Sequence, residues 1–132
     1  MTKEQQAVRD RNVAAVEAMY ESERVRDLTA WTSLWHPEGR QTFPFAQAAT
    51  VEGIEQLTET TRHKFESRPP YAIHVVTEPF EDPARVLARL RLETPQGQLL
   101  AVIWCVFHLD KAGLIVEVEE MLDTASATPI PG

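Results

Sequence analysis

Several features that mark whole classes of protein are scarce in this chain of 132 residues. Its single cysteine, Cys105, excludes an internal disulfide and any zinc site built from paired cysteines. No apolar run reaches the roughly 18 residues that a membrane span needs. The first twelve residues, MTKEQQAVRDRN, lack the apolar centre of a signal peptide. These absences predict a cytoplasmic protein in which Cys105 is a buried structural thiol.

Positive charge is also scarce. Lysine and arginine number 13 against 20 aspartates and glutamates, which gives a net charge of −7. Binding to nucleic acid or to an anionic membrane needs basic patches, so neither partner is expected. The sequence has no glycine-rich phosphate loop and no His-x-x-x-His or Cys-x-x-Cys spacing. We therefore expect neither a cofactor nor a metal site.

Helical periodicity is present in three segments of the first half of the chain. They cover residues 3 to about 22, about 25 to 35, and 51 to 70. The HPEG stretch, residues 36–39, is expected to end the second helix with its proline and glycine. Residues 40–46 predict a short strand, and Pro44 inside it favours a sheet edge or a bulge.

Strand patterns occupy the second half of the chain. They cover residues 71–78, 85–93, 98–110 and 114–123, with turn sequences between them. In residues 85–93 apolar residues alternate with arginines, as in a half-buried strand. The predicted fold is α+β: a cone-shaped, curved antiparallel sheet with three helices that close a pocket. Residues 1–123 form one domain in this prediction, and residues 124–132 form a loosely ordered tail.

The last predicted strand contains the first candidate for chemistry. Glu120 falls on the same face as Val116, Val118 and Leu122 when the strand is read with a period of two. A carboxyl on that apolar face would lose hydration, which raises its pKa and suits it to acid or base catalysis. The alternative is a β-bulge that turns the end of the strand and exposes Glu120 to water.

Several stretches resemble the nuclear transport factor 2-like superfamily, which includes ketosteroid isomerases, SnoaL-like polyketide cyclases and other proteins with a cystatin-like fold. They are NVAAVEAMY, LWHPEG, VEGIEQL and FHLDKAGLIVEVEEMLD, which lie within residues 12–123. Within that superfamily the stretches RNVAAVEAMY, FEDP, VEEMLD and PIP are most similar to the phenazine-biosynthesis A/B proteins. The resemblance implies a homodimer, a deep apolar pocket for a small apolar or aromatic molecule, and acid–base chemistry inside that pocket.

The resemblance also implies roles for particular residues. The glutamate that acts as the acid in the phenazine proteins falls on Glu120. Their third-helix histidine falls on Thr60, and this departure argues against phenazine chemistry itself. Ketosteroid isomerases carry a first-helix tyrosine near Tyr20, although Met19 is the alternative match.

Two histidines and two tryptophans complete the candidate site. His74 either pairs with Glu120 across the cavity or lies on the solvent face, with Ile73 and Val75 buried instead. His108 either reaches Glu120 or ends its strand in water. Tyr20, Trp35 and Trp104 either line the pocket or belong to the core, as aromatic residues at regular spacing commonly do.

Two classes of function fit these expectations. The first is a small-molecule enzyme, of secondary metabolism, that isomerises, cyclises, condenses or dehydrates an apolar or aromatic intermediate. It would use Glu120 and His74 as catalytic groups, and Tyr20, Trp35, Trp104 and His108 as binding groups, without a cofactor. The second is a non-catalytic ligand carrier or dimeric assembly module on the same fold.

Overall fold

The computed structural model describes residues 1–122, so the predicted tail and Asp123 lie outside the described residues. Three helices and six strands follow one another along the chain. Their bounds are α1 Lys3–Val25, α2 Leu28–Ser33, β1 Trp35–Thr42, β2 Val51–Glu52, α3 Gly53–Ser67, β3 Ala72–Pro79, β4 Arg85–Glu93, β5 Leu99–Leu109 and β6 Ile115–Leu122. The predicted α+β class is confirmed.

The six strands form one sheet in the order β2-β1-β6-β5-β4-β3. Strands β3 to β6 make the expected antiparallel meander. Strand β1, however, pairs with β6 in parallel, so the prediction of a purely antiparallel sheet is wrong at this position. Strand β1 is separated from β6 by α3 and the whole meander, and such a long connection allows the parallel direction that a hairpin forbids.

The prediction that HPEG ends a helix is also wrong, because residues 36–39 lie inside β1. The pairing of β1 with β6 shifts register between Trp35 and Arg40, so Pro37 needs no ladder hydrogen bond. A Cβ on Gly39 would come 2.6 Å from the Trp35 ring, which explains a glycine at this position. The bulged stretch lets the backbone close over Trp35.

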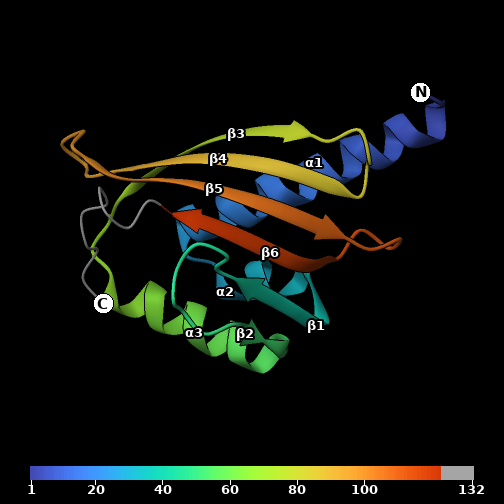
Figure 1. Cartoon of the computed structure of the whole chain (residues 1–132). Coiled ribbons are helices and arrows are strands. Elements are labelled where there is room, and N and C mark those ends of the chain that lie inside the picture. The colour runs from blue at the N-terminus through green and yellow to red at the C-terminus, as the bar shows by residue number, and fades with distance from the viewer. Residues whose placement is uncertain (123–132) are drawn as a thin grey trace.

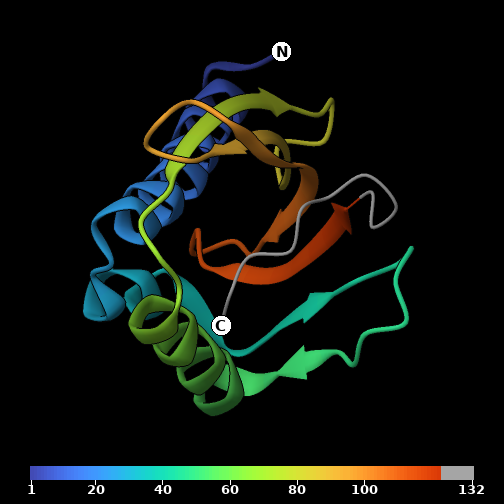
Figure 2. The same ribbon diagram turned by 90° about the vertical axis from the view of Figure 1, so that its left-hand side faces the viewer.

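The sheet curls without closing, and the helices lie along its open side (Figures 1 and 2). Helix α1 packs on β3 and β4, α3 packs on β1 and β2, and α2 joins the two helices. This arrangement gives the predicted cone. The inner face of the curl is therefore bounded by sheet on one side and by helices on the other.

Alternation in the central strands positions the core as predicted. Strand β4 turns Val86, Ala88, Leu90 and Leu92 inward, and all four are buried. Strand β5 adds a row of buried side chains on the same face: Ala101, Ile103, Cys105, Phe107 and Leu109. Tyr20 of α1 packs edge-on against Phe107, with 5.8 Å between the ring centroids. The prediction of a buried Cys105 thiol is confirmed.

No helix among residues 1–122 is long and apolar enough to cross a bilayer. Helices α1 and α2 each begin with a side-chain cap. Helix α1 begins with a capping box, in which the Thr2 hydroxyl accepts from the Gln5 backbone and the Gln5 side chain accepts from the Thr2 backbone.

Candidate functional site

A pocket lies inside the curl, between the inner face of the sheet and the three helices. It measures about 580 Å³ when the space at its open mouth is included. Apolar side chains from β3, β4 and β5 form much of its wall. The polar and aromatic groups that line it are Tyr20, Glu23, Trp31, Trp35, Gln41, Lys64, Arg68, Tyr71, Cys105 and Glu120.

Glu120 lies on the inner face of β6, two residues after the buried Val118, and a bulge occurs earlier in the same strand. Ile115 pairs with Leu109 and Glu117 with His108, so Val116 is an extra residue in the ladder. The bulge places Ile115 on the inner face together with Val118 and Glu120. The sequence left open a bulge that would expose Glu120. The bulge in the structure lies before Glu120, at Val116, and Glu120 stays on the inner face of the sheet.

The surroundings of Glu120 favour its neutral form. Its Oε2 accepts a 3.0 Å hydrogen bond from Nε2 of Gln41. Burial raises the pKa of Glu120, and nearby Glu23 raises it further, while Lys64, Arg68 and the Gln41 hydrogen bond oppose this rise. The net result is a raised pKa, which makes Glu120 a candidate proton donor or acceptor.

An ion pair between α1 and α3 lies in the wall of the same pocket. Nζ of Lys64 is 2.9 Å from Oε1 of Glu23, and Nε1 of Trp31 donates to the same oxygen at 3.3 Å. Burial lowers the pKa of Lys64, but attraction and hydrogen bonding to Glu23 outweigh burial and raise it overall. The pocket therefore holds a fixed positive and a fixed negative charge beside Glu120.

Tyr20 and Cys105 form a second polar contact deep in the pocket. Burial raises the pKa of the Tyr20 phenol well above its usual range, and the neighbouring Cys105, Glu23 and Glu120 act in the same direction. Burial also raises the pKa of the Cys105 thiol. The raised pKa values favour the protonated form of both groups, so the Cys105 thiolate is disfavoured and the Tyr20 hydroxyl keeps its proton.

Four buried side-chain donors have no partner among residues 1–122, and two of them belong to residues of the pocket. These two are Nε1 of Trp35 and Nε of Arg68. Buried donors without partners are uncommon, because each one loses its hydrogen bonds to water without replacement. An oxygen atom of a bound molecule would satisfy them.

The chain matches a known family over most of its length. The sequence profile of the SnoaL-like domain family matches residues 16–118. The chain belongs to the SnoaL-like domain family. A comparison of the sequence with proteins of curated function gives no match.

Several solved structures share the fold of this chain. A phenazine biosynthesis-related protein from Pseudomonas aeruginosa superposes with a TM-score of 0.74 and 15% identity, covering 98% of this chain and 94% of that chain. A steroid delta-isomerase from the same species gives 0.68 and 18%, covering 89% and 82%. A SnoaL-like polyketide cyclase candidate from Jannaschia sp. CCS1 gives 0.70 and 22%, covering 89% and 88%. At these identities the likeness establishes the fold alone. Another similar structure is described as having a cystatin-like fold.

Three residues predicted for the site of this SnoaL-like domain lie outside the pocket. They are His74, Trp104 and His108, which are on the outer face of the sheet. The side chains of His74 and His108 are 59% and 30% exposed, and Trp104 as a whole residue is 47% exposed. His74 contacts Glu93 at 3.2 Å instead of Glu120. His108 contacts Glu119 at 2.8 Å, also away from the pocket. Of the alternatives left open by the sequence, the structure favours the solvent face for both histidines, and for His74 it turns Ile73 and Val75 inward instead.

The structure brings Tyr20, Trp35 and Glu120 together, as the sequence suggested, and adds groups that the sequence analysis missed. Glu23 and Lys64 are the main additions, followed by Gln41 and Arg68. A signal for the first two was present. Glu23 continues the inward spacing of α1 three residues after Tyr20, and Lys64 lies seven residues after the buried Leu57 of α3.

The side chain of Arg26 connects helices α1 and α3 beside the pocket. Arg26 follows α1 in the left-handed conformation, at φ 58°. Its guanidinium donates to the backbone oxygens of Phe65, Arg68 and Pro69, at 2.8, 2.7 and 2.9 Å. This clamp connects the C-terminal ends of α1 and α3, and so it sets the distance between Glu23 and Lys64.

Proposed function

We propose that the chain is a cofactor-independent acid–base enzyme that acts on a small apolar or aromatic molecule bearing a carbonyl or hydroxyl oxygen. The observation that carries the proposal is the position of Glu120, whose raised pKa places a transferable proton in the pocket. Isomerisation, cyclisation, condensation and dehydration all begin or end with such a proton transfer.

The proton would be carried by the oxygen of Glu120 that faces no donor. Oε2 is occupied as an acceptor from Gln41, while Oε1 accepts no hydrogen bond from residues 1–122. A neutral Glu120 would donate from Oε1 to a substrate oxygen. In its ionised form the same group would remove a proton from a carbon next to a carbonyl.

Other pocket groups would hold the substrate oxygen in place. The unpartnered Nε1 of Trp35 and Nε of Arg68 can each donate one hydrogen bond, and the Tyr20 phenol could do so by giving up its contact with Cys105. Donors that are fixed before binding stabilise negative charge that develops on a carbonyl oxygen. In this proposal the charged groups that act on Glu120 are Glu23 and Lys64, and neither His74 nor His108 takes part.

The test uses proton exchange, because it requires no knowledge of the natural reaction. A panel of cyclic and aromatic ketones is first screened for binding by thermal shift. Ligands that bind are then incubated in deuterated buffer, and deuterium incorporation next to the carbonyl is followed by NMR. Wild type should exchange this position, and Glu120→Gln should lose roughly 100-fold or more of the rate while it still binds.

A matched control is Glu38→Gln, because Glu38 is exposed on β1 and does not line the pocket. It should leave the exchange rate unchanged. Equal exchange rates in wild type and Glu120→Gln would remove Glu120 from the mechanism. Tight binding with no chemistry in either protein would support a ligand carrier instead.

The proposal includes a homodimer formed through the outer face of the sheet. Val76, Arg89 and Trp104 lie opposite one another on β3, β4 and β5. Val76 and Trp104 are exposed, as is Val102 beside them, and together these three residues form the outer patch. Arginine and glutamate side chains flank the patch, including the Arg89–Glu78 pair, so a two-fold contact can match opposite charges.

Sedimentation equilibrium tests this association. Wild type should sediment as a dimer, and Trp104→Glu should sediment as a folded monomer, because the new charge would be buried without a partner at the contact. A monomeric wild type, or a dimer that Trp104→Glu leaves intact, would place the contact elsewhere or remove it.

A further inference from the structure

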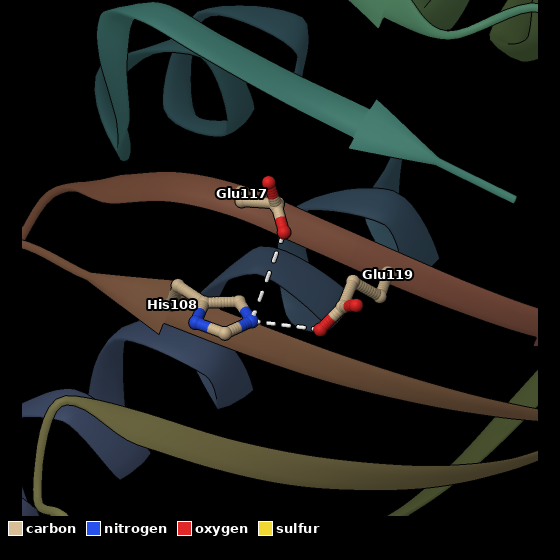
Figure 3. Close-up of side chains that lie close together, drawn as sticks. All are labelled: His108, Glu117 and Glu119. Atoms are coloured by element: carbon tan, nitrogen blue, oxygen red, sulfur yellow. Dashed lines mark hydrogen bonds and ion pairs between the residues drawn. The ribbon is translucent and has the colours of Figure 1, made fainter. Parts of the chain in front are cut away.

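Three side chains with metal-binding atoms converge on the outer face of the sheet, near the end of β5. They are His108, Glu117 and Glu119, whose ligand atoms all lie within 4.8 Å of one another (Figure 3). Nε2 of His108 is 2.8 Å from Oε2 of Glu119 and 3.8 Å from Oε2 of Glu117. Among residues 1–122 this is the one group of three such side chains.

The strand register explains why the three side chains meet. His108 lies directly opposite Glu117 in the antiparallel ladder, and Glu119 follows two residues later on the same face. The extra residue Val116 turns Glu117 outward while Ile115 stays in the core. All three ligand atoms thus project from two hydrogen-bonded strands, which form a more rigid support than loops.

We propose that His108, Glu117 and Glu119 bind a divalent transition-metal ion, with Zn²⁺ as the reference ion. One imidazole nitrogen and two carboxylate oxygens are common zinc ligands, with bonds of about 2.0–2.2 Å. Ligands in a tetrahedral zinc site are therefore about 3.4 Å apart, by geometry from those bond lengths. The two distances from His108, 2.8 and 3.8 Å, lie on either side of that value, and all three ligand atoms lie within 4.8 Å, so side-chain rotation would have to bring the ligand atoms into place around an ion.

Partial burial makes the group more than a chance surface cluster. The exposed fractions of the His108, Glu117 and Glu119 side chains are 30%, 18% and 36%. Three protein ligands leave the fourth position of a tetrahedral ion to water or to a small molecule. The site would therefore be an open one.

Two arginines face this group from the neighbouring strands. Nε of Arg40, on β1, donates to Oε1 of Glu117, which leaves Oε2 to face His108. Arg85, opposite His108 on β4, places its guanidinium over the Phe80 ring at 4.6 Å. The two carboxylates and the two arginines sum to zero, so these four groups carry no net positive charge that would repel a divalent ion. Arg40 also orients Glu117, as partners behind metal ligands commonly do.

The site is independent of the pocket. Glu120 points to the inner face of β6, whereas Glu117 and Glu119 point to the outer face. Metal binding can therefore be tested whether or not the acid–base function holds.

The experiment is a titration of the untagged chain with Co²⁺ and Zn²⁺ after dialysis against a chelator. Co²⁺ reports its coordination through visible absorption, and calorimetry with Zn²⁺ gives the stoichiometry. We expect one ion per chain in wild type. His108→Ala and Glu119→Gln should each weaken binding by about tenfold or more, in line with losses seen for groups near metals.

The matched control is His74→Ala. His74 lies on the same face and also contacts a glutamate, Glu93, but within residues 1–122 it belongs to no group of three ligands. Its removal should leave the affinity unchanged. Circular dichroism of each variant checks that the fold is intact. No binding by wild type, or equal loss in His74→Ala and His108→Ala, would overturn the proposal.

Discussion

Glu23 and Lys64 are 41 residues apart in the chain, yet they form a 2.9 Å ion pair in the wall of the pocket. Their side chains are only 11% and 23% exposed. The pair connects α1 to α3 and places both charges close enough to act on the pKa of Glu120. It is the feature that most clearly links packing of the helices to chemistry in the pocket.

Removing one partner of this pair should destabilise the fold more than removing both. Glu23→Gln leaves the Lys64 ammonium partly buried without a counter-charge, with an expected loss of about 3 kcal/mol in unfolding free energy. The double variant Glu23→Gln with Lys64→Met removes both charges and should recover much of that loss. Urea denaturation of the two single variants and the double variant measures the coupling. Losses that simply add would mean that the two charges do not interact.

The pH dependence of stability should report the state of Glu120. Its pKa is raised in the folded protein, so its contribution is fully present below the unfolded value of about 4.3. That contribution is lost as pH rises through the raised folded pKa. Glu120→Leu should therefore gain stability relative to wild type between pH 4 and pH 8, by about 1–3 kcal/mol.

Unfolding free energies across that pH range provide the measurement. Glu120→Gln keeps the shape of the side chain and removes only the charge, so it should follow the leucine variant. Glu38→Leu, on the exposed part of β1, gives the effect of an ordinary surface replacement. A difference between wild type and Glu120→Leu that stays flat with pH would indicate a carboxyl in contact with water.

Tyr20 should resist ionisation as long as the protein is folded. Its pKa is raised well above 10.0, with burial as the main cause, so the neutral phenol is favoured. Stability that depends on the neutral phenol is lost as pH rises above its unfolded pKa of about 10. In an alkaline titration followed by ultraviolet absorption, one of the two tyrosines should ionise only with unfolding. Tyr20→Phe should abolish that late step, and its persistence would assign it to Tyr71.

Arg26 should stabilise the fold through its three backbone contacts. Arg26→Lys keeps the charge but cannot reach three carbonyl oxygens at once, so the unfolding free energy should fall by about 2–3 kcal/mol. Arg24→Lys is the control in the same turn of α1, because Arg24 only contacts the exposed Glu21 and should have little effect. Thermal melting of both variants compares them directly. Equal melting temperatures would show that the clamp contributes nothing.

Periodicity in the sequence was sufficient to predict which side of α1 and of β4 faces the core. The stripe of α1 and the alternation of β4 each have one clearly apolar side, so the inward face follows from burial alone. The same reasoning failed for β3, where Ile73 and Val75 compete with Ala72 and Val76. Only the pairing of His74 with the outward-facing Arg91 of β4 settles which set lies outside.

The first strand shows a different limit. HPEG contains two residues that commonly end helices, and local rules favoured a turn there. The structure accommodates both residues in a bulged strand, because pairing with β6 begins again at Arg40 and the Trp35 ring requires a glycine beside it. Contacts with a strand near the other end of the chain therefore override the local preference.

The sequence by itself determined the α+β class, the order of the strands in the meander and the placement of Glu120 on an apolar face. Each of these follows from spacing along one element, which burial of apolar side chains enforces locally. The tertiary structure alone decided which groups accompany Glu120 and which histidines face water. That decision depends on the curl of the sheet, the bulge at Val116 and the packing of α1 against α3, all of which arise from contacts between residues far apart in the chain.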